Sequence, residues 1–140
     1  MKQLDKLEYV EQLGKLEFVE KGFETMRVVN RESAEHYNWK AVCDGWHFLK
    51  SDELSIIAEK MPPQTFEDMH YHCKSKQFFY ILSGEVVMNL QNGSKKLVAG
   101  MGVEVAPMEV HQMTNVSEME AEFIVVSMPK SHGDKIIVSE

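Results

Sequence analysis

The chain has 140 residues and a mass of 16.1 kDa, the size of one domain that can bury about two-thirds of its unfolded surface. Its 44% hydrophobic content excludes an intrinsically disordered chain, and a net charge of -7 without a basic cluster argues against nucleic acid as a partner. Cys43 and Cys73 are too few for the disulfide framework of a small secreted domain. The charged start lacks the apolar run of a signal peptide, and no stretch has the roughly 18 to 20 apolar residues of a membrane span. The sequence therefore predicts a soluble, cytoplasmic protein with no membrane partner.

Residues 1–25 form a segment of their own kind. They contain a near-repeat, KLEYVEQLG at 6–14 and KLEFVEKGF at 15–23, which is too few copies for a solenoid. Apolar residues recur there at steps of three: Leu4, Leu7, Val10, Leu13 and Leu16. This spacing predicts an amphipathic helix through about Leu13, followed by an extended stretch. We expect residues 1–25 to be an N-terminal extension that packs on the main body or on a second subunit, the alternative being a frayed tail.

Residues 26–140 have the pattern of an all-β protein. Short apolar or β-branched segments follow one another with turn residues between them, at spacings of roughly 8 to 12 residues. The segments are MRVVN, WHFLK, ELSIIAEKM, QFFYILS, EVVMNLQ, KKLVAG, GVEVAP, HQMTNV and AEFIVVSM. Asn92-Gly93 is a strong hairpin signal, and only residues 33–36 favour a single helical turn. We therefore predict one antiparallel barrel.

Two closely spaced histidines form the one group of residues in the sequence that could act together, as metal ligands. His70 and His72 bracket Tyr71, and on a strand residues i and i+2 point to the same face, about 7 Å apart along the chain. Two imidazoles on one face suit a single metal ion, although such a triplet is a weak signal by itself.

The surroundings make the signal more specific. Gln64, His70, His72, Gln77 and Gly84 form a first block, and a second block follows it: Gly100, Pro107, His111 and Asn115. In order and spacing these blocks resemble the paired motifs of the cupin superfamily, G-x5-HxH-x3/4-E-x6-G and G-x5-PxG-x2-HxxxN. The stretches CDGWHFLK, MPP and PKSHGD also look like those of small single-domain bacterial cupins of unassigned reaction.

The resemblance implies a double-stranded β-helix, or jelly-roll, barrel that holds a divalent metal. The implied ligands are His70, His72 and His111, with Gln77 at the position of the family's acid. It also implies a homodimer, with the N-terminal segment as a swapped or interfacial element.

Three residues depart from the family pattern. Gln64 and Glu109 replace turn glycines, which should be tolerated if their backbones have negative φ. Gln77 replaces the carboxylate with a neutral amide, so a site with metal would keep a formal charge near +2 and attract an anionic ligand. Three imidazoles still favour Zn, Ni, Cu or Fe over Mn. The alternative is a barrel that has lost its metal, with Gln77 hydrogen-bonded to His70 or His72.

Strand alternation predicts the lining of the pocket. If Gln77 faces inward, Phe79 does too, and Met113 shares the face of His111. Met88 on a neighbouring strand could join them, although core filling is the commoner role of a methionine.

The other polar groups carry weaker hypotheses. Cys73 should face away from the metal as a buried, inert thiol, and Cys43 could lie at the barrel mouth beside Trp46 or His47. Glu67 and Asp68 are the nearest carboxylates that could substitute for the missing acid. Three further histidines are expected to be structural or solvated, the last with a lid over the mouth as its alternative: His36, His47 and His132.

Three functions follow from this set. The first is an enzyme in which the metal acts as a Lewis acid or oxygen-activating centre on a small anionic molecule, as a dioxygenase or isomerase would. The second is a non-catalytic cupin module that binds a small molecule or a metal. The third is a purely structural dimer. The sequence leaves the catalytic residues and the substrate unassigned.

Overall fold

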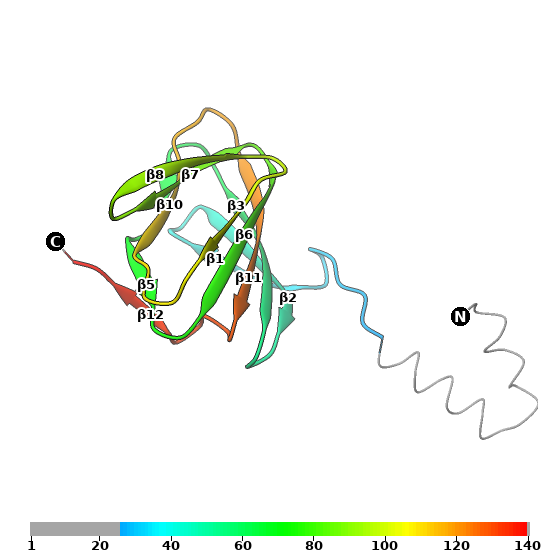
Figure 1. The fold of residues 1–140 in the computed structure, drawn as a ribbon. Helices are drawn as coiled ribbons and strands as arrows, with labels where there is room; N and C mark the ends of the chain where they lie inside the picture. Colours follow the sequence, from blue (N-terminus) through cyan, green and yellow to red (C-terminus); the bar gives the residue numbers. More distant parts are fainter. Residues whose placement is uncertain (1–25, 140) are drawn as a thin grey trace, which may run out of the picture.

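The computed structural model describes residues 26–139 (Figure 1). The helix expected through Leu13 and the packing expected of residues 1–25 lie outside the described residues. Over residues 26–139 every regular element is a strand. In this part of the chain no helix is therefore long and apolar enough to cross a membrane.

Residues 26–139 contain twelve strands. Their bounds are β1 Glu35–Trp39, β2 Cys43–Lys50, β3 Ser55–Met61, β4 Thr65–Phe66, β5 His70–His72, β6 Lys76–Ser83, β7 Glu85–Leu90, β8 Gly93–Val98, β9 Gly102–Val105, β10 His111–Asn115, β11 Ala121–Met128 and β12 Lys135–Ile137.

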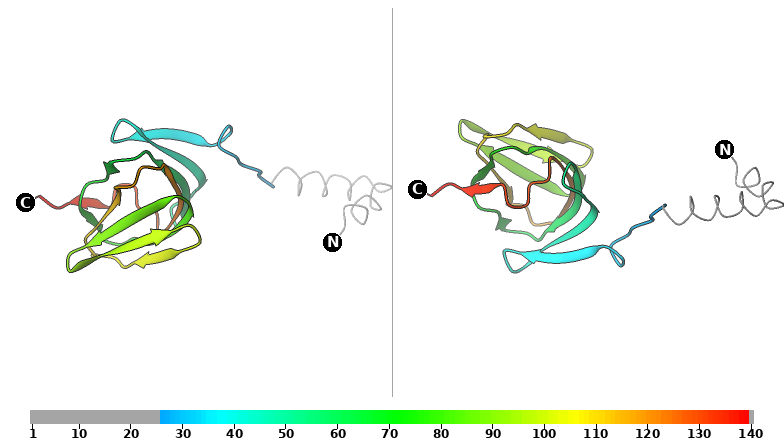
Figure 2. Two further views of the ribbon diagram at one scale, coloured as in Figure 1. Left: turned by 90° about the horizontal axis from the view of Figure 1, so that it is seen from above. Right: turned by 90° about the horizontal axis from the view of Figure 1, so that it is seen from below.

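The strands form two antiparallel sheets that face each other. One sheet has the order β1-β2-β3-β11-β6-β9, and the other the order β12-β5-β10-β7-β8, with β4 paired to β10. Figure 2 shows the strands of both sheets around a common interior. Some neighbours, such as β3 and β11 or β5 and β10, come from distant parts of the chain, as in a jelly roll. The predicted all-β, antiparallel barrel is therefore confirmed.

Strict alternation along the strands positions the core. In β6 the side chains of Gln77, Phe79 and Ile81 are buried while their neighbours are exposed. The register of β11 places Val125 beside Phe79 and Ser127 beside Gln77. The inward-facing apolar side chains form one hydrophobic core.

Two local predictions near the start of the described chain are wrong. The MRVVN segment at 26–30 has no strand, and Glu35 and His36, expected in a helical turn, begin β1. The strand is hard to recognise because it lies at a sheet edge with mostly exposed side chains and no apolar alternation. Pairing with β2 stabilises it, assisted by a hydrogen bond between His36 Nε2 and Asp44 Oδ1 at 2.7 Å.

The β7–β8 hairpin is present, but its turn lies one residue earlier than Asn92-Gly93. Leu90 pairs with Gly93, so Gln91 and Asn92 form the turn. Gly93 begins β8 with a φ of 154°, a conformation that L side chains rarely adopt, and Asn92 has no positive φ.

The backbone at Gln64 also differs from expectation. Its φ is 62°, so this residue occupies the left-handed region that the family's glycine would occupy more easily. Its side chain offsets part of this strain, because Nε2 donates to the carbonyls of Val116 and Ser117 at 2.9 and 3.2 Å. At the second departure, Glu109, φ is not positive, and the left-handed residue is its neighbour Met108 at 70°.

Candidate metal centre

Three buried histidines meet inside the barrel. Strand β5 supplies His70 and His72 from one face, and His111 of β10 lies directly opposite His70 in the ladder. One nitrogen of each ring lies within 4.8 Å of the corresponding atoms of the other two. The side chains are 3%, 5% and 0% exposed, so the structure brings all three sequence-predicted histidines together in a nearly dry site.

Backbone carbonyls fix the orientation of two of these rings. His70 Nδ1 lies 2.6 Å from the Asp68 carbonyl, and His111 Nδ1 lies 2.9 Å from that of Glu109. A carbonyl only accepts, so each Nδ1 carries the proton and each Nε2 keeps its lone pair. This is the arrangement in which an imidazole binds a metal ion.

Unpartnered buried atoms fit a cation at this point. His111 Nε2 and His72 Nδ1 are buried without a hydrogen-bond partner among the described residues. Burial lowers the pKa of His70 to about 3 and that of His72 to about 4, and it also lowers the pKa of His111. All three rings are thus neutral near pH 7, so their lone pairs are available to a metal ion without loss of a proton.

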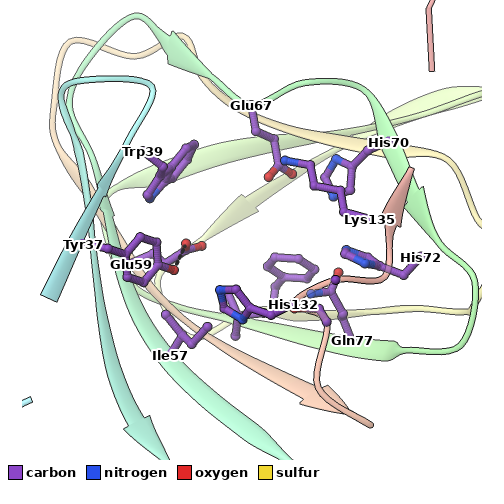
Figure 3. A pocket seen from close by; sticks show the side chains of 14 residues that line it. Tyr37, Trp39, Ile57, Glu59, Glu67, His70, His72, Gln77, His132 and Lys135 are labelled. Carbon is purple, nitrogen blue, oxygen red and sulfur yellow. Dashed lines mark hydrogen bonds between the residues drawn. The ribbon is translucent and has the colours of Figure 1, made fainter. Parts of the chain in front are cut away.

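Gln77 presents its oxygen to the same site. Its Nε2 donates to Ser127 Oγ at 3.0 Å, while Oε1 is buried and accepts no hydrogen bond from residues 26–139. Figure 3 shows this side chain beside His72. The alternative in which Gln77 bonds to His70 or His72 does not describe this structure, since its only donated bond goes to Ser127.

A cavity of about 290 Å3 opens next to the histidines (Figure 3). Phe79, Ile57 and Val125 give it an apolar wall, so Phe79 lies where the sequence predicts. Met88 and Met113, also expected in the lining, are instead packed in the hydrophobic core at 0% and 1% exposure. The two residues face each other in the β7–β10 ladder, farther into the barrel than the cavity extends.

Two carboxylates that the family motif does not include also line the cavity. Glu59 Oε2 accepts a hydrogen bond from the Tyr37 hydroxyl at 2.9 Å, and Glu67 Oε1 accepts one from the Met113 N–H at 2.9 Å. Burial raises the pKa of Glu59 to about 7 and that of Glu67 to about 8. Asp68, the other carboxylate suggested by the sequence, points away and pairs with Lys40 Nζ at 2.7 Å.

The last described strand completes the cavity. Strand β12 pairs with β5, with Lys135 opposite His72, and this brings Lys135 and His132 to the cavity rim. Asp134 anchors the segment by accepting bonds from the backbone N–H groups of residues 73–75. Sequence reasoning missed Lys135 because the three-residue KII strand has no alternation of its own.

The remaining candidates have structural positions. Cys73 faces away from the histidines, as alternation predicts, but it is exposed and not buried, because it lies just past the end of β5. Cys43 is buried in the core and does not lie at the barrel mouth. His47 is buried with its ring 5.1 Å from that of the exposed His132, and His36 pairs with an acid at the surface. Asn115 binds three carbonyls that close the neighbouring loop, those of Met61, Pro62 and Met119.

Similar proteins share this fold. The family described as "Cupin domain" matches residues 58–127. No curated protein matches the chain.

Among solved structures, the polyketide cyclase RemF from Streptomyces resistomycificus has a TM-score of 0.70 at 16% identity. The match covers 83% of this chain and 89% of the RemF chain. An uncharacterized double-stranded β-helix protein from Klebsiella pneumoniae has a TM-score of 0.68 at 17% identity, covering 82% and 99%. A predicted oxalate decarboxylase from Thermotoga maritima has a TM-score of 0.67 at 20% identity, covering 74% and 100%.

Proposed function

This chain belongs to the cupin family, and from that premise we propose that it is a metal-dependent cupin acting on a small organic molecule with an anionic oxygen. The observation that carries the proposal is the group of unpartnered buried atoms at the cavity base. His72 Nδ1, His111 Nε2 and Gln77 Oε1 have no hydrogen-bond partner among residues 26–139, and a divalent cation would satisfy all of them.

The ligand set favours a borderline transition metal. His70, His72 and His111 would hold the ion, with Gln77 Oε1 as a neutral fourth donor, and such a set favours Zn, Ni, Cu or Fe. When bound, the metal would supply Lewis-acid polarisation of a substrate oxygen. Because every one of these protein ligands is neutral, the ion would keep its charge and attract an anionic group.

The chain's own residues supply the rest of the site. Phe79, Ile57 and Val125 exclude water from one side of the cavity, which strengthens electrostatic contacts inside it. Glu59 and Glu67 hold or release a proton near neutral pH, since burial places their pKa values at about 7 and about 8. They are the groups of the described chain best suited to act as a general base. Gln77, which stands at the position of the family's acid, cannot take this role because its amide does not accept a proton.

One observation favours a second function, a binding module without turnover. The family acid is Gln77 in this chain, and its amide can neither take up a proton nor neutralise the metal. Saturable binding of a ligand without conversion would support this candidate. The homodimer and the cytoplasmic location remain predictions.

The test is a titration of metal-stripped full-length protein with Co2+ and Zn2+. We expect one equivalent of each to bind, with visible Co2+ absorption bands that report nitrogen and oxygen ligands and disappear when Zn2+ is added. No binding of either ion would overturn the proposed function. Product formation in a substrate screen with the loaded protein would then separate the enzyme from the binding module.

Restoring the family acid should strengthen the site. In the Gln77→Glu variant a carboxylate would replace the amide, keep a partner in the Ser127 hydroxyl, and neutralise one of the two charges of the metal. We expect affinity for Mn2+, a hard ion, to rise by about tenfold or more, which corresponds to one charge-assisted contact. Competition with a chelating dye measures this directly, and an unchanged Mn2+ affinity would mean that residue 77 does not contact the ion.

A further inference from the structure

The cavity has two chemically different ends. In Figure 3 His70, His72 and Gln77 lie at one end, Glu59 and its neighbours Tyr37 and Trp39 lie at the other, and Glu67 points into the space between them. The proposed function uses the histidine end to bind an anionic group. The carboxylate end requires a ligand of a different character.

Each carboxylate is held through one oxygen and leaves the other free. Tyr37 fixes Glu59 through Oε2, and the Met113 N–H fixes Glu67 through Oε1. Their second oxygens, Glu59 Oε1 and Glu67 Oε2, accept no hydrogen bond from any described residue, and both side chains line the cavity. Each side chain is thus held in place by one hydrogen bond and keeps one acceptor oxygen that no described residue occupies.

Vacant acceptors recognise donors, which in small molecules are hydroxyl or ammonium groups. Three features favour hydroxyls. Burial and the charge of Glu59 both raise the pKa of Glu67, to about 8, so the pair keeps at least one of its two protons near pH 7 and lacks the full charge that an ammonium would require. Lys135 adds a positive charge to the same cavity. A hydroxyl, unlike an ammonium, can also accept a hydrogen bond from the protonated member of the pair.

We propose that Glu59 and Glu67 form the hydroxyl-binding half of the site, and that the ligand class is a small polyhydroxylated carboxylate. Its carboxylate would lie at the histidine end and its hydroxyls at the glutamates. The inference rests on the proposed function, because the neutral histidines attract an anion only through a bound divalent ion. The volume of about 290 Å3 is at the small end for ligand pockets, which limits the ligand to roughly the size of a six-carbon acid.

The test compares gluconate with hexanoate, two six-carbon carboxylates that differ in their hydroxyls, on Zn2+-loaded full-length protein by calorimetry. We expect gluconate to bind about tenfold more tightly or better. In Glu59→Gln, gluconate affinity should fall about tenfold, as expected for one lost charge-assisted hydrogen bond, with hexanoate affinity unchanged. Glu67→Gln should have a smaller effect, because its neutral amide resembles the protonated acid. An amide oxygen can still accept from Tyr37 or from the Met113 N–H, so these variants keep the anchoring bonds.

The controls separate this inference from the proposed function. Glu53→Gln removes the same charge from an exposed position outside the cavity and should leave both affinities unchanged. Zn2+ stoichiometry, measured in every variant, reports the metal site alone. A wild-type protein that binds no Zn2+ would overturn the proposed function. With Zn2+ bound, equal affinity for the two acids, no binding of either, or a gluconate preference that survives both substitutions would overturn the hydroxyl-binding role.

Discussion

Replacing His111 with alanine is expected to lower Zn2+ affinity by more than about 100-fold. Even a residue that only orients a metal ligand typically changes affinity by 10- to 100-fold, and His111 would be a direct ligand. Its Nε2 is fully buried with no partner among the described residues, and its Nδ1 is held by the Glu109 carbonyl, so no other group can take its place. The measurement is competition of metal-stripped protein with a chelator of known affinity.

A matched histidine provides the control. His36→Ala removes an exposed ring that pairs with Asp44 at the surface, and it should leave Zn2+ affinity unchanged. His70→Ala should repeat the loss seen for His111→Ala, because both rings contribute to the same cluster. Thermal unfolding of each metal-stripped variant establishes that it is folded. A folded His111→Ala protein that binds Zn2+ like the wild type would contradict the assigned ligand set.

Raising the pH from about 5 to about 8 should destabilise the wild type relative to a Glu67→Gln variant by on the order of 2 to 3 kcal/mol. Burial raises the pKa of Glu67 from 4.5 to about 8. Between these values the folded protein binds more protons at Glu67 than the unfolded chain does. Stability that the neutral acid provides at low pH is therefore lost as the pH rises through the folded-state value.

Urea unfolding of metal-stripped protein at several pH values measures this difference. The lowered pKa values of the histidines make stability rise with pH, which is opposite to the effect of Glu67. This contribution is the same in the wild type and the variant, so it cancels when the two proteins are compared. Glu53→Gln, at an exposed position, should follow the wild type at every pH. Parallel curves for the wild type and Glu67→Gln would show that the buried carboxyl titrates normally.

Much of the barrel was predictable because strand alternation is a local property. The inward face of β6 follows directly from its sequence, so the alternation alone predicts that Gln77 and Phe79 point into the barrel. The same holds for the pair His70 and His72, whose two-residue spacing puts both rings on one face. Edge strand β1 was not predicted, because it has no apolar pattern of its own and is kept extended by its pairing with β2.

Met88 and Met113 show what strand alternation cannot predict. Alternation correctly predicts that both side chains point inward, but it does not predict how far along the barrel axis each side chain lies. That depth depends on strand register and on which residues fill the space from the opposite sheet. Both methionines consequently belong to the hydrophobic core, while Phe79, also facing inward, borders the cavity.

By itself, the sequence determined the all-β class, the cupin motif blocks and the histidine set, because spacing within a strand decides which side chains share a face. Only the tertiary structure decided what surrounds that set. Glu59 and Glu67 come from β3 and the segment after β4, and Lys135 from β12, and these segments meet through long-range pairings. The raised pKa values of the two carboxyls arise from burial, which depends on the packing of the whole barrel and is not encoded in any single segment.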